Sequence, residues 1–311
     1  MSEKNKIEKV RHSPQSFNWS DIPKPDESVI DSLQRTYKFH PLDLEDCLSE
    51  SQRPKIDDYD DYIFMVLHIP IRSGRARHIK TSEVNIFIGP DFVITLHDND
   101  PTIKKLFAEC QENRKTREEY LAKGPGYFLY MLTDDLFGSC FPLLDSLGKN
   151  INDLESEVFD PDHSRDRLKD ILMLKKDIIN FRRMIIPQRA IVAQLEHKNK
   201  KFLPDNLDVY FDDVVDKIEK VWNNLENLQE LTASLQETNE SIISHNTNNI
   251  IKILTLFSVV MLPLTVITGF YGMNIIGLPF AEHGQATLII GGLLFGVMVT
   301  MFAYFRFRRW I

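Results

Sequence analysis

The chain has 311 residues and a formal net charge of −8, from 45 acidic and 37 basic side chains. This acidic balance argues against nucleic acid as a partner, because binding to a phosphate backbone needs a basic surface. The sequence has no G-x-x-x-x-G-K-[ST] segment to bind ATP and no H-E-x-x-H segment, so we expect neither ATP use nor catalysis. The three cysteines lack C-x-x-C spacing, which predicts reduced, structural thiols and no bound cofactor.

The first part of the chain, residues 1–125, mixes helical and strand patterns and predicts an α/β domain. Tyr62–Ile69 is a dense run of β-branched and aromatic residues, typical of a strand buried on both faces. Glu83–Ile88 and Phe92–His97 flank the turn sequence Gly89-Pro90-Asp91, which predicts a hairpin. Helical spacing marks three further segments: Asp26–Tyr37, Pro41–Leu48 and Pro101–Gln111.

Residues 126–204 predict a cytosolic region of long helices. Tyr127–Val158 has the pattern of one continuous helix that is stopped by Asp160-Pro161. A second helix is expected from Ser164, a candidate N-cap, to about His197, with a kink at Pro187. The chain is then expected to turn before the next helix.

A third helix is predicted to run from Asp205 to Gly269, because no glycine or proline occurs between Pro204 and Pro263. Its first part, the stalk of residues 205–249, carries apolar residues at the spacing of a coiled-coil seam. These residues are Val214, Ile218, Val221, Leu225, Leu228, Leu235 and Ile242. Two compatible interpretations follow: the stalk packs on its own domain, or it is a rod that carries a cytosolic signal to the membrane.

Two apolar runs predict transmembrane helices at residues 250–273 and 286–305, since each has about the ~20 residues that cross a bilayer. The connecting loop, residues 274–285, has no lysine or arginine, whereas the tail, residues 306–311, has three arginines. By the positive-inside rule the loop is extracytoplasmic and both termini are cytoplasmic. No cleaved signal peptide is expected, and the destination is a plasma or inner membrane.

One face of the first predicted crossing, which we call the polar stripe, is rich in polar and small residues. Its members recur at helical spacing: Asn248, Ile251, Thr255, Ser258, Leu262, Thr265, Gly269 and Gly272. Polar groups in lipid need partners, so the stripe indicates either helix–helix packing or the lining of a pore. Two crossings cannot enclose a channel, so a pore requires several copies of the chain.

The polar stripe has no acidic and no basic side chain, so an ion would contact only hydroxyl, amide and carbonyl groups. This suits Mg²⁺, which dehydrates reluctantly and whose bound waters need hydrogen-bond acceptors. Leu254, with Ile251 and Leu262, can supply apolar constrictions that gate by dewetting. At the outer end, Gly272-Met273-Asn274 closes the helix: glycine lets the backbone turn its carbonyls inward, and several asparagines would form an oxygen ring.

Several segments resemble the CorA family of divalent-cation transporters. They are Tyr271-Gly272-Met273-Asn274 after Met261-Leu262-Pro263-Leu264-Thr265, Asn248–Thr255, His40-Pro41-Leu42 with Leu44-Glu45-Asp46, and Gln52-Arg53-Pro54-Lys55. The resemblance covers nearly all of the chain after about Phe39. It implies a homopentamer with a cytosolic funnel, a central pore lined by the first crossing, and Mg²⁺ as principal substrate with Co²⁺ and Ni²⁺ tolerated.

The resemblance implies that Gly272, Met273 and Asn274 form the selectivity filter. The matching pore-facing positions are Asn248, Ile251, Leu254, Leu262 and Thr265. The outer loop departs from the family, because Leu278-Pro279-Phe280-Ala281 stands where members often have Met-Pro-Glu-Leu. Because this acidic residue is missing, electrostatic attraction of ions to the outer end of the pore is less certain than the fold. Zinc-transporting members similar to ZntB usually lack methionine in the tripeptide, which favours magnesium.

Two acidic clusters lie outside the membrane segments: Asp57-Asp58-Tyr59-Asp60-Asp61 and Asp212-Asp213-x-x-Asp216. By composition alone such runs are typical of solvated faces. The resemblance implies that Asp61 and Asp213 hold a regulatory divalent cation between neighbouring subunits. On this hypothesis, cytosolic Mg²⁺ bridges the carboxylates and keeps the pore closed, and repulsion opens it when Mg²⁺ falls.

Two alternatives remain at this point. One is a Zn²⁺ transporter of the same fold. The other is a membrane-anchored sensor or scaffold whose coiled coil signals without passing ions. The polar stripe argues against the second, since an anchor does not need aligned asparagine, serine and threonine residues within the bilayer.

Overall fold

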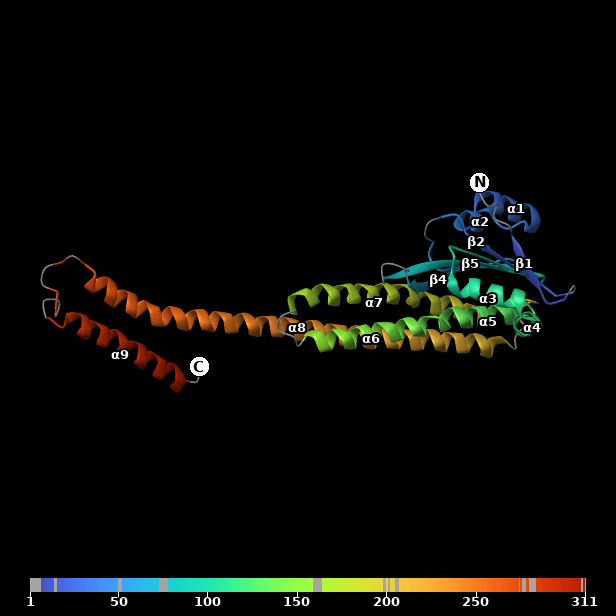
Figure 1. The fold of residues 1–311 in the computed structure, drawn as a ribbon. Helices are drawn as coiled ribbons and strands as arrows, with labels where there is room; N and C mark the ends of the chain where they lie inside the picture. The colour runs from blue at the N-terminus through green and yellow to red at the C-terminus, as the bar shows by residue number, and fades with distance from the viewer. Residues whose placement is uncertain are drawn as a thin grey trace. The chain divides into compact units, whose positions relative to one another are not determined.

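The computed structural model describes residues 7–13, 16–49, 52–72, 78–158, 164–197, 200, 202–204, 207–273, 275, 278–279, 284–308 and 310. Its contacts divide the chain into two compact units, Met1–Thr238 and Asn239–Ile311. The helix α8, Asp208–Tyr271, begins in the first unit and ends in the second (Figure 1).

The first unit contains a six-stranded sheet in the order β1-β2-β6-β5-β4-β3. All neighbouring strands are antiparallel except β2 and β6, which are parallel. The strands are β1 Glu8–Arg11, β2 Asn18–Pro23, β3 Lys55–Asp58, β4 Ile63–Arg72, β5 Ile79–Ile88 and β6 Phe92–His97. Sequence patterns did not predict β1, β2 or β3.

The predicted central strand and hairpin are confirmed. Residues Ile63–Leu67 of β4 are fully buried, as expected for a strand covered on both faces. In the hairpin, Ile88 pairs with Val93, and the Gly89 amide donates to the Phe92 carbonyl at 2.9 Å.

Helices cover both faces of the sheet (Figure 1). On one face lie α1, Glu27–Tyr37, and α2, Pro41–Asp46, whose apolar residues share a core with Phe64, Phe87 and Ile94 of the sheet. On the other face, the Trp19 ring contacts Phe107 of α3, at 4.9 Å between centroids, and Phe128 of α5, at 4.7 Å. The helices on this side include α3 Pro101–Glu112, α4 Arg114–Leu121 and α5 Pro125–Gly138.

The expectation of one helix over Tyr127–Val158 is wrong. Helix α5 ends at Gly138 and α6, Cys140–Val158, begins two residues later. The physical reason is Pro142, which has no N–H to donate to the Gly138 carbonyl. The next helix, α7, runs over Ser164–Ala193 with Pro187 inside it, and a 3₁₀ turn, Gln194–His197, follows.

The stalk part of α8 packs on its own unit. Val214, Ile218, Val221 and Leu225 are at most 1% exposed, and Leu235 is 5% exposed. Leu228 and Ile242 are half-buried. The seam predicted as a coiled coil is therefore covered by the chain's own helices from Val214 to Leu235.

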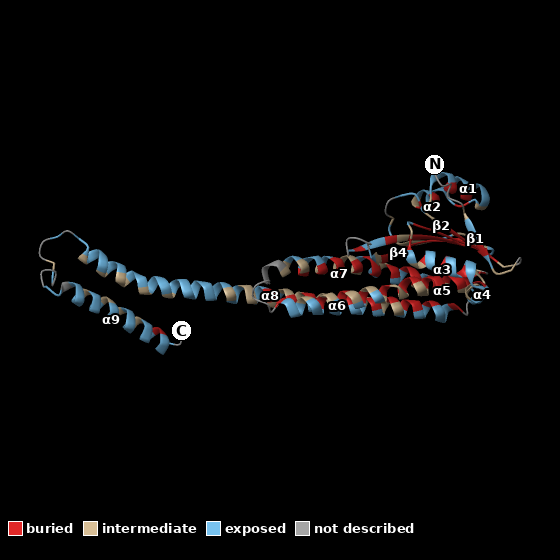
Figure 2. Cartoon of the chain, viewed as in Figure 1, coloured by how far each residue is buried: buried red, intermediate tan, exposed pale blue. Residues whose placement is uncertain are grey.

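The second unit holds the apolar end of α8 and helix α9, Ala286–Phe307. Both helices are long and apolar enough to cross a membrane, and their apolar stretches are almost wholly exposed (Figure 2). Exposed apolar surface of this extent needs lipid or protein to cover it. The two predicted crossings are present as helices.

Candidate functional site

The predicted pore-lining residues lie on the exposed apolar end of α8. Ile251, Leu254 and Leu262 are 54%, 63% and 70% exposed. The remaining members are exposed too: Asn248, Thr255, Ser258, Thr265 and Gly269. Ile253, off the polar stripe, is equally exposed at 68%. One copy of the chain therefore covers neither face of this helix.

The hydroxyls of the polar stripe share one hydrogen-bonding arrangement. Thr255 donates to the Ile251 carbonyl at 2.7 Å, Ser258 to Leu254 at 2.9 Å and Thr265 to Met261 at 2.8 Å. Each hydroxyl thus uses its only proton within its own helix, and its remaining lone pairs can only accept. A row of acceptors suits a hydrated cation, which presents hydrogen atoms outward.

Gly272 lies where α8 ends, immediately after Tyr271. Its amide donates to the Thr268 carbonyl at 2.9 Å, and a Cβ built there would lie 3.0 Å from that same oxygen. The absence of a side chain therefore permits this close turn. Met273 follows, with its amide 3.4 Å from the Phe270 carbonyl. The third predicted filter residue, Asn274, lies outside the described residues.

In the acidic run of residues 57–61, two carboxylates form ion pairs with lysines and two others are exposed. Lys55 binds Asp57 at 2.5 Å and Asp46 of α2 at 2.7 Å. Lys200 binds Asp58 at 2.9 Å. Asp60 and Asp61 are exposed and form no ion pair within the described part of the chain. These two carboxylates are the ones that can meet a cation from solution.

The turn that carries Asp60 and Asp61, residues 59–62, is held by a buried carboxylate that sequence reasoning missed. The Tyr59 amide donates to the Tyr62 carbonyl at 3.0 Å. The hydroxyls of Tyr59 and Tyr62 donate to Asp43 at 3.1 and 2.9 Å, and Asp43 is 1% exposed. Burial raises the pKa of Asp43. The sequence offered one signal for this residue: Asp43 lies within the segment His40–Asp46, part of which resembles the CorA family.

Asp213 lies in the first turns of α8 and is exposed. The charge of Asp213 acts on Tyr130, whose pKa is raised by burial and by the negative charges of Asp134 and Asp213. No hydrogen bond or ion pair joins Asp61 to Asp213, and the described residues contain no cluster of three or more metal-ligating side chains.

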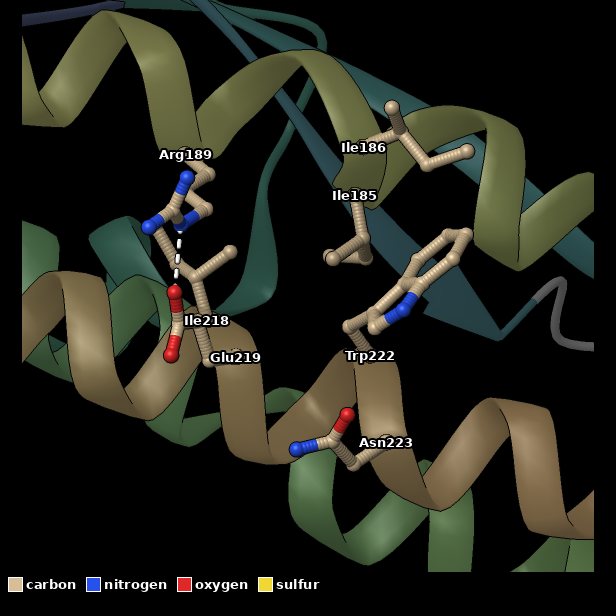
Figure 3. Close-up of a pocket in the computed structure, with 7 residues that line it drawn as sticks. All are labelled: Ile185, Ile186, Arg189, Ile218, Glu219, Trp222 and Asn223. Atoms are coloured by element: carbon tan, nitrogen blue, oxygen red, sulfur yellow. Dashed lines mark hydrogen bonds and ion pairs between the residues drawn. The ribbon is translucent and has the colours of Figure 1, made fainter.

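A groove between α7 and α8 has a volume of about 580 Å³ and contains no predicted site residue. Ile185, Ile218 and Trp222 line it, and Arg189 binds Glu219 at 2.5 Å across one end (Figure 3). The Arg182 guanidinium lies 4.1 Å from the centre of the Trp222 ring. These contacts tie the stalk to α7.

The three cysteines lie in the interior of the first unit. All three are free and buried. Burial raises the pKa of Cys110 and of Cys140 to about 12, so their thiols stay protonated at neutral pH.

Known proteins are similar to this chain over most of its length. The YfjQ protein of Bacillus subtilis is 30% identical over 98% of this chain and 93% of its own length. The cobalt/magnesium transport protein CorA of Thermotoga maritima is 26% identical over 96% of this chain and 84% of its own. The zinc transport protein ZntB of Photorhabdus laumondii is 22% identical over 84% and 78%.

The same fold occurs in the solved structure of the CorA magnesium transporter from Methanocaldococcus jannaschii. The TM-score is 0.83 at 21% identity, with 100% of this chain and 95% of that chain covered. The family profile described as CorA-like Mg²⁺ transporter protein matches residues 14–309. The chain therefore belongs to the CorA family, whose members are membrane transporters of divalent metal ions and not enzymes.

Proposed function

We propose that this chain forms a homopentamer that passes Mg²⁺ into the cytoplasm down its electrochemical gradient, with Co²⁺ and Ni²⁺ as further substrates. The observation that carries the proposal is the polar stripe, whose hydroxyls are fixed as acceptors by bonds to their own helix. No other part of the described chain covers this stripe. The profile match and the T. maritima relative support the choice of ion.

In this pentamer, five copies of α8 surround one axis with their polar stripes inward. Hydroxyl oxygens of Thr255, Ser258 and Thr265 accept hydrogen bonds from the water shell of Mg²⁺, so the ion need not lose its waters. The exposed side chains of Ile251 and Leu254 form a narrow apolar ring that closes by dewetting. Gly272, Met273 and Asn274 receive the ion at the outer mouth.

Regulation is proposed to occur between subunits. Asp61 of one copy and Asp213 of its neighbour, both exposed, bind cytosolic Mg²⁺ as a regulatory ligand. Removal of the ion leaves like charges facing each other, which loosens the ring and opens the pore. Asp60, which is exposed beside Asp61, adds to this charge.

The proposed orientation places both termini in the cytoplasm of a plasma or inner membrane. The arginines of the tail, residues 306–311, contrast with the loop of residues 274–285, which has none. With this orientation, the first unit and its acidic turn sample the cytosolic Mg²⁺ concentration.

Growth of a cell that lacks Mg²⁺ uptake tests the proposed pore. The wild-type chain is expected to rescue growth, and Asn274→Ala is expected to fail, because the mouth loses its amide oxygens. Asn249→Ala serves as the matched control, since Asn249 lies one residue off the polar stripe and should rescue. Rescue by Asn274→Ala, or no rescue by the wild type, would contradict the assignment.

A Zn²⁺ transporter of the same fold is the second candidate, favoured by the similarity to ZntB and by the loop that lacks the usual acid at Phe280. Uptake of Mg²⁺, Co²⁺ and Zn²⁺ into liposomes that contain the purified chain separates the candidates. Uptake of Zn²⁺ alone would select the zinc transporter. No uptake of any ion would select a non-conducting sensor or scaffold.

A further inference from the structure

Lys200 lies in the short segment between the 3₁₀ turn and α8. Its carbonyl accepts a hydrogen bond from the Leu203 amide at 2.9 Å, and Phe202 and Leu203 are 7% and 3% exposed. A Cβ built on Gly126 would lie 2.4 Å from the Phe202 carbonyl oxygen, so this segment is in close contact with the start of α5. Phe202 and Leu203 are thus packed against the start of α5.

The side chain of Lys200 reaches the acidic turn. Its Nζ lies 2.9 Å from the Asp58 carboxylate and donates to the Tyr59 carbonyl at 2.5 Å, across 141 positions in sequence. The Lys200 and Asp58 side chains are only 18% and 33% exposed, so solvent screens this pair less than a surface pair. One ammonium therefore joins the turn to the segment that leads into α8.

Among the contacts of the turn, those to Asp43 and to Lys200 lead to different parts of the first unit. Asp43 holds the Tyr59 and Tyr62 hydroxyls and belongs to α2, on the far side of the sheet from the long helices. Lys200 leads to α8, and α8 continues into the apolar run that carries the polar stripe. Lys200 lies eight residues before the first residue of that helix.

We propose that Lys200 is a positioning residue that couples the acidic turn to the start of α8, so that a cation bound at Asp61 restrains the pore helix. This inference rests on the proposed regulation by Asp61 and Asp213. Removing the ammonium leaves the surroundings of the turn one unit more negative. Cation binding should therefore persist or tighten while its effect on α8 is lost. A purely structural role would not separate binding from closure.

The test measures Mg²⁺ influx into liposomes that contain the full chain, at a series of internal Mg²⁺ concentrations. Lys200→Met is expected to transport at low internal Mg²⁺ but to need on the order of tenfold more internal Mg²⁺ for half-closure. Lys200→Arg should restore most of the response. Lys220→Met removes an exposed lysine of α8 and should behave as wild type. Stabilisation of the detergent-solubilised chain by Mg²⁺ against heat should be retained in Lys200→Met.

Asp58→Asn gives an independent variant if Lys200→Met does not fold. It should raise the half-closing concentration in the same direction, and the double variant should add little, since both changes break one interaction. The coupling would be overturned if both variants closed at the same internal Mg²⁺ concentration as wild type. It would also be overturned if the variants lost both closure and the stabilisation by Mg²⁺ against heat. Asp61→Ala separates the two proposals. If Asp61→Ala closes normally at high internal Mg²⁺, both the proposed regulation by Asp61 and the coupling through Lys200 are overturned. If Asp61→Ala closes poorly but Lys200→Met closes as wild type does, only the coupling is overturned.

Discussion

At the scale of single residues, Asp43 shows how burial and hydrogen bonds oppose each other. Burial raises its pKa, while the bonds from Tyr62 and Tyr59 lower it, and the net direction is upward from 3.8. The folded protein therefore holds this proton more tightly than the unfolded chain does. Its contribution to the free energy of unfolding falls as pH rises from 3.8 through the raised value and is constant above that.

We expect Asp43→Asn to remove this pH-dependent contribution. The loss of stability caused by the substitution should be larger at pH 4 than at pH 7, because only the wild type gains stability at this site on acidification. Thermal unfolding of the solubilised chain at both pH values measures the difference. A stability difference that is equal at the two pH values, or larger at pH 7, would refute the assignment.

Gly126 is a second residue whose environment makes a sharp prediction. An added Cβ would meet the Phe202 carbonyl at 2.4 Å and a Leu207 methyl at 2.8 Å. Because backbone cannot move aside cheaply, Gly126→Ala should cost about 1–3 kcal/mol of stability. Gly138→Ala in the same helix is the control, since nothing lies within 4 Å of its Cβ, and it should be neutral or stabilising. Equal melting temperatures for the two variants would contradict this account.

At the scale of elements, the sequence predicted the helices and strands that have a regular local pattern of apolar and turn residues. The buried strand β4, the β5–β6 hairpin and the long helix α8 all follow from periodicity and turn residues. Strand β2 was missed because its sequence, NWSDIP, carries polar residues typical of loops. In the structure Asp21 of β2 accepts from Thr95 at 2.7 Å and pairs with His97 at 3.0 Å, partners more than seventy positions away.

In the candidate site too, local patterns were predictable from sequence and long-range contacts were not. The polar stripe was predictable because helical spacing alone places its members on one face. The contact between Lys200 and the acidic turn was not, since it joins distant positions through a segment without a repeating pattern. Asp43 was hidden for another reason: a buried aspartate looks like a solvated one until the fold places two tyrosines against it.

The hydroxyls of α8 allow a test of the element that carries the proposed function. Thr255→Val and Ser258→Ala each remove an acceptor with little change of shape, and one hydrogen bond is worth about 0.5–1.5 kcal/mol. The double variant should lower Mg²⁺ influx by roughly fivefold to a hundredfold at unchanged membrane abundance. Thr300→Val on α9, which loses an equivalent hydroxyl bonded to Gly296 at 2.7 Å, should retain wild-type influx. Equal losses in both would show general helix damage.

At the scale of the whole molecule, introduced cysteines can test the proposed pore, because the chain's own thiols are buried. Cys47, Cys110 and Cys140 are inaccessible, so a water-soluble thiol reagent should leave wild-type uptake intact. We expect the reagent to block Ser258→Cys, whose side chain faces the proposed pore, and to spare Ile253→Cys, which lies off the polar stripe. Block of both variants, or of neither, would contradict an axis lined by this face.

The two crossings share one further property: no Asp, Glu, Lys or Arg occurs from Ile253 to Tyr271 or from Ala286 to Phe305. A voltage sensor needs charges that move through the field, at roughly 2.3 kcal/mol per charge per 100 mV. These two stretches carry no such gating charge, and Lys252 lies just before the first of them. Membrane potential should therefore scale the current through an open pore without changing how often the pore is open, which single-channel recordings at several voltages can measure.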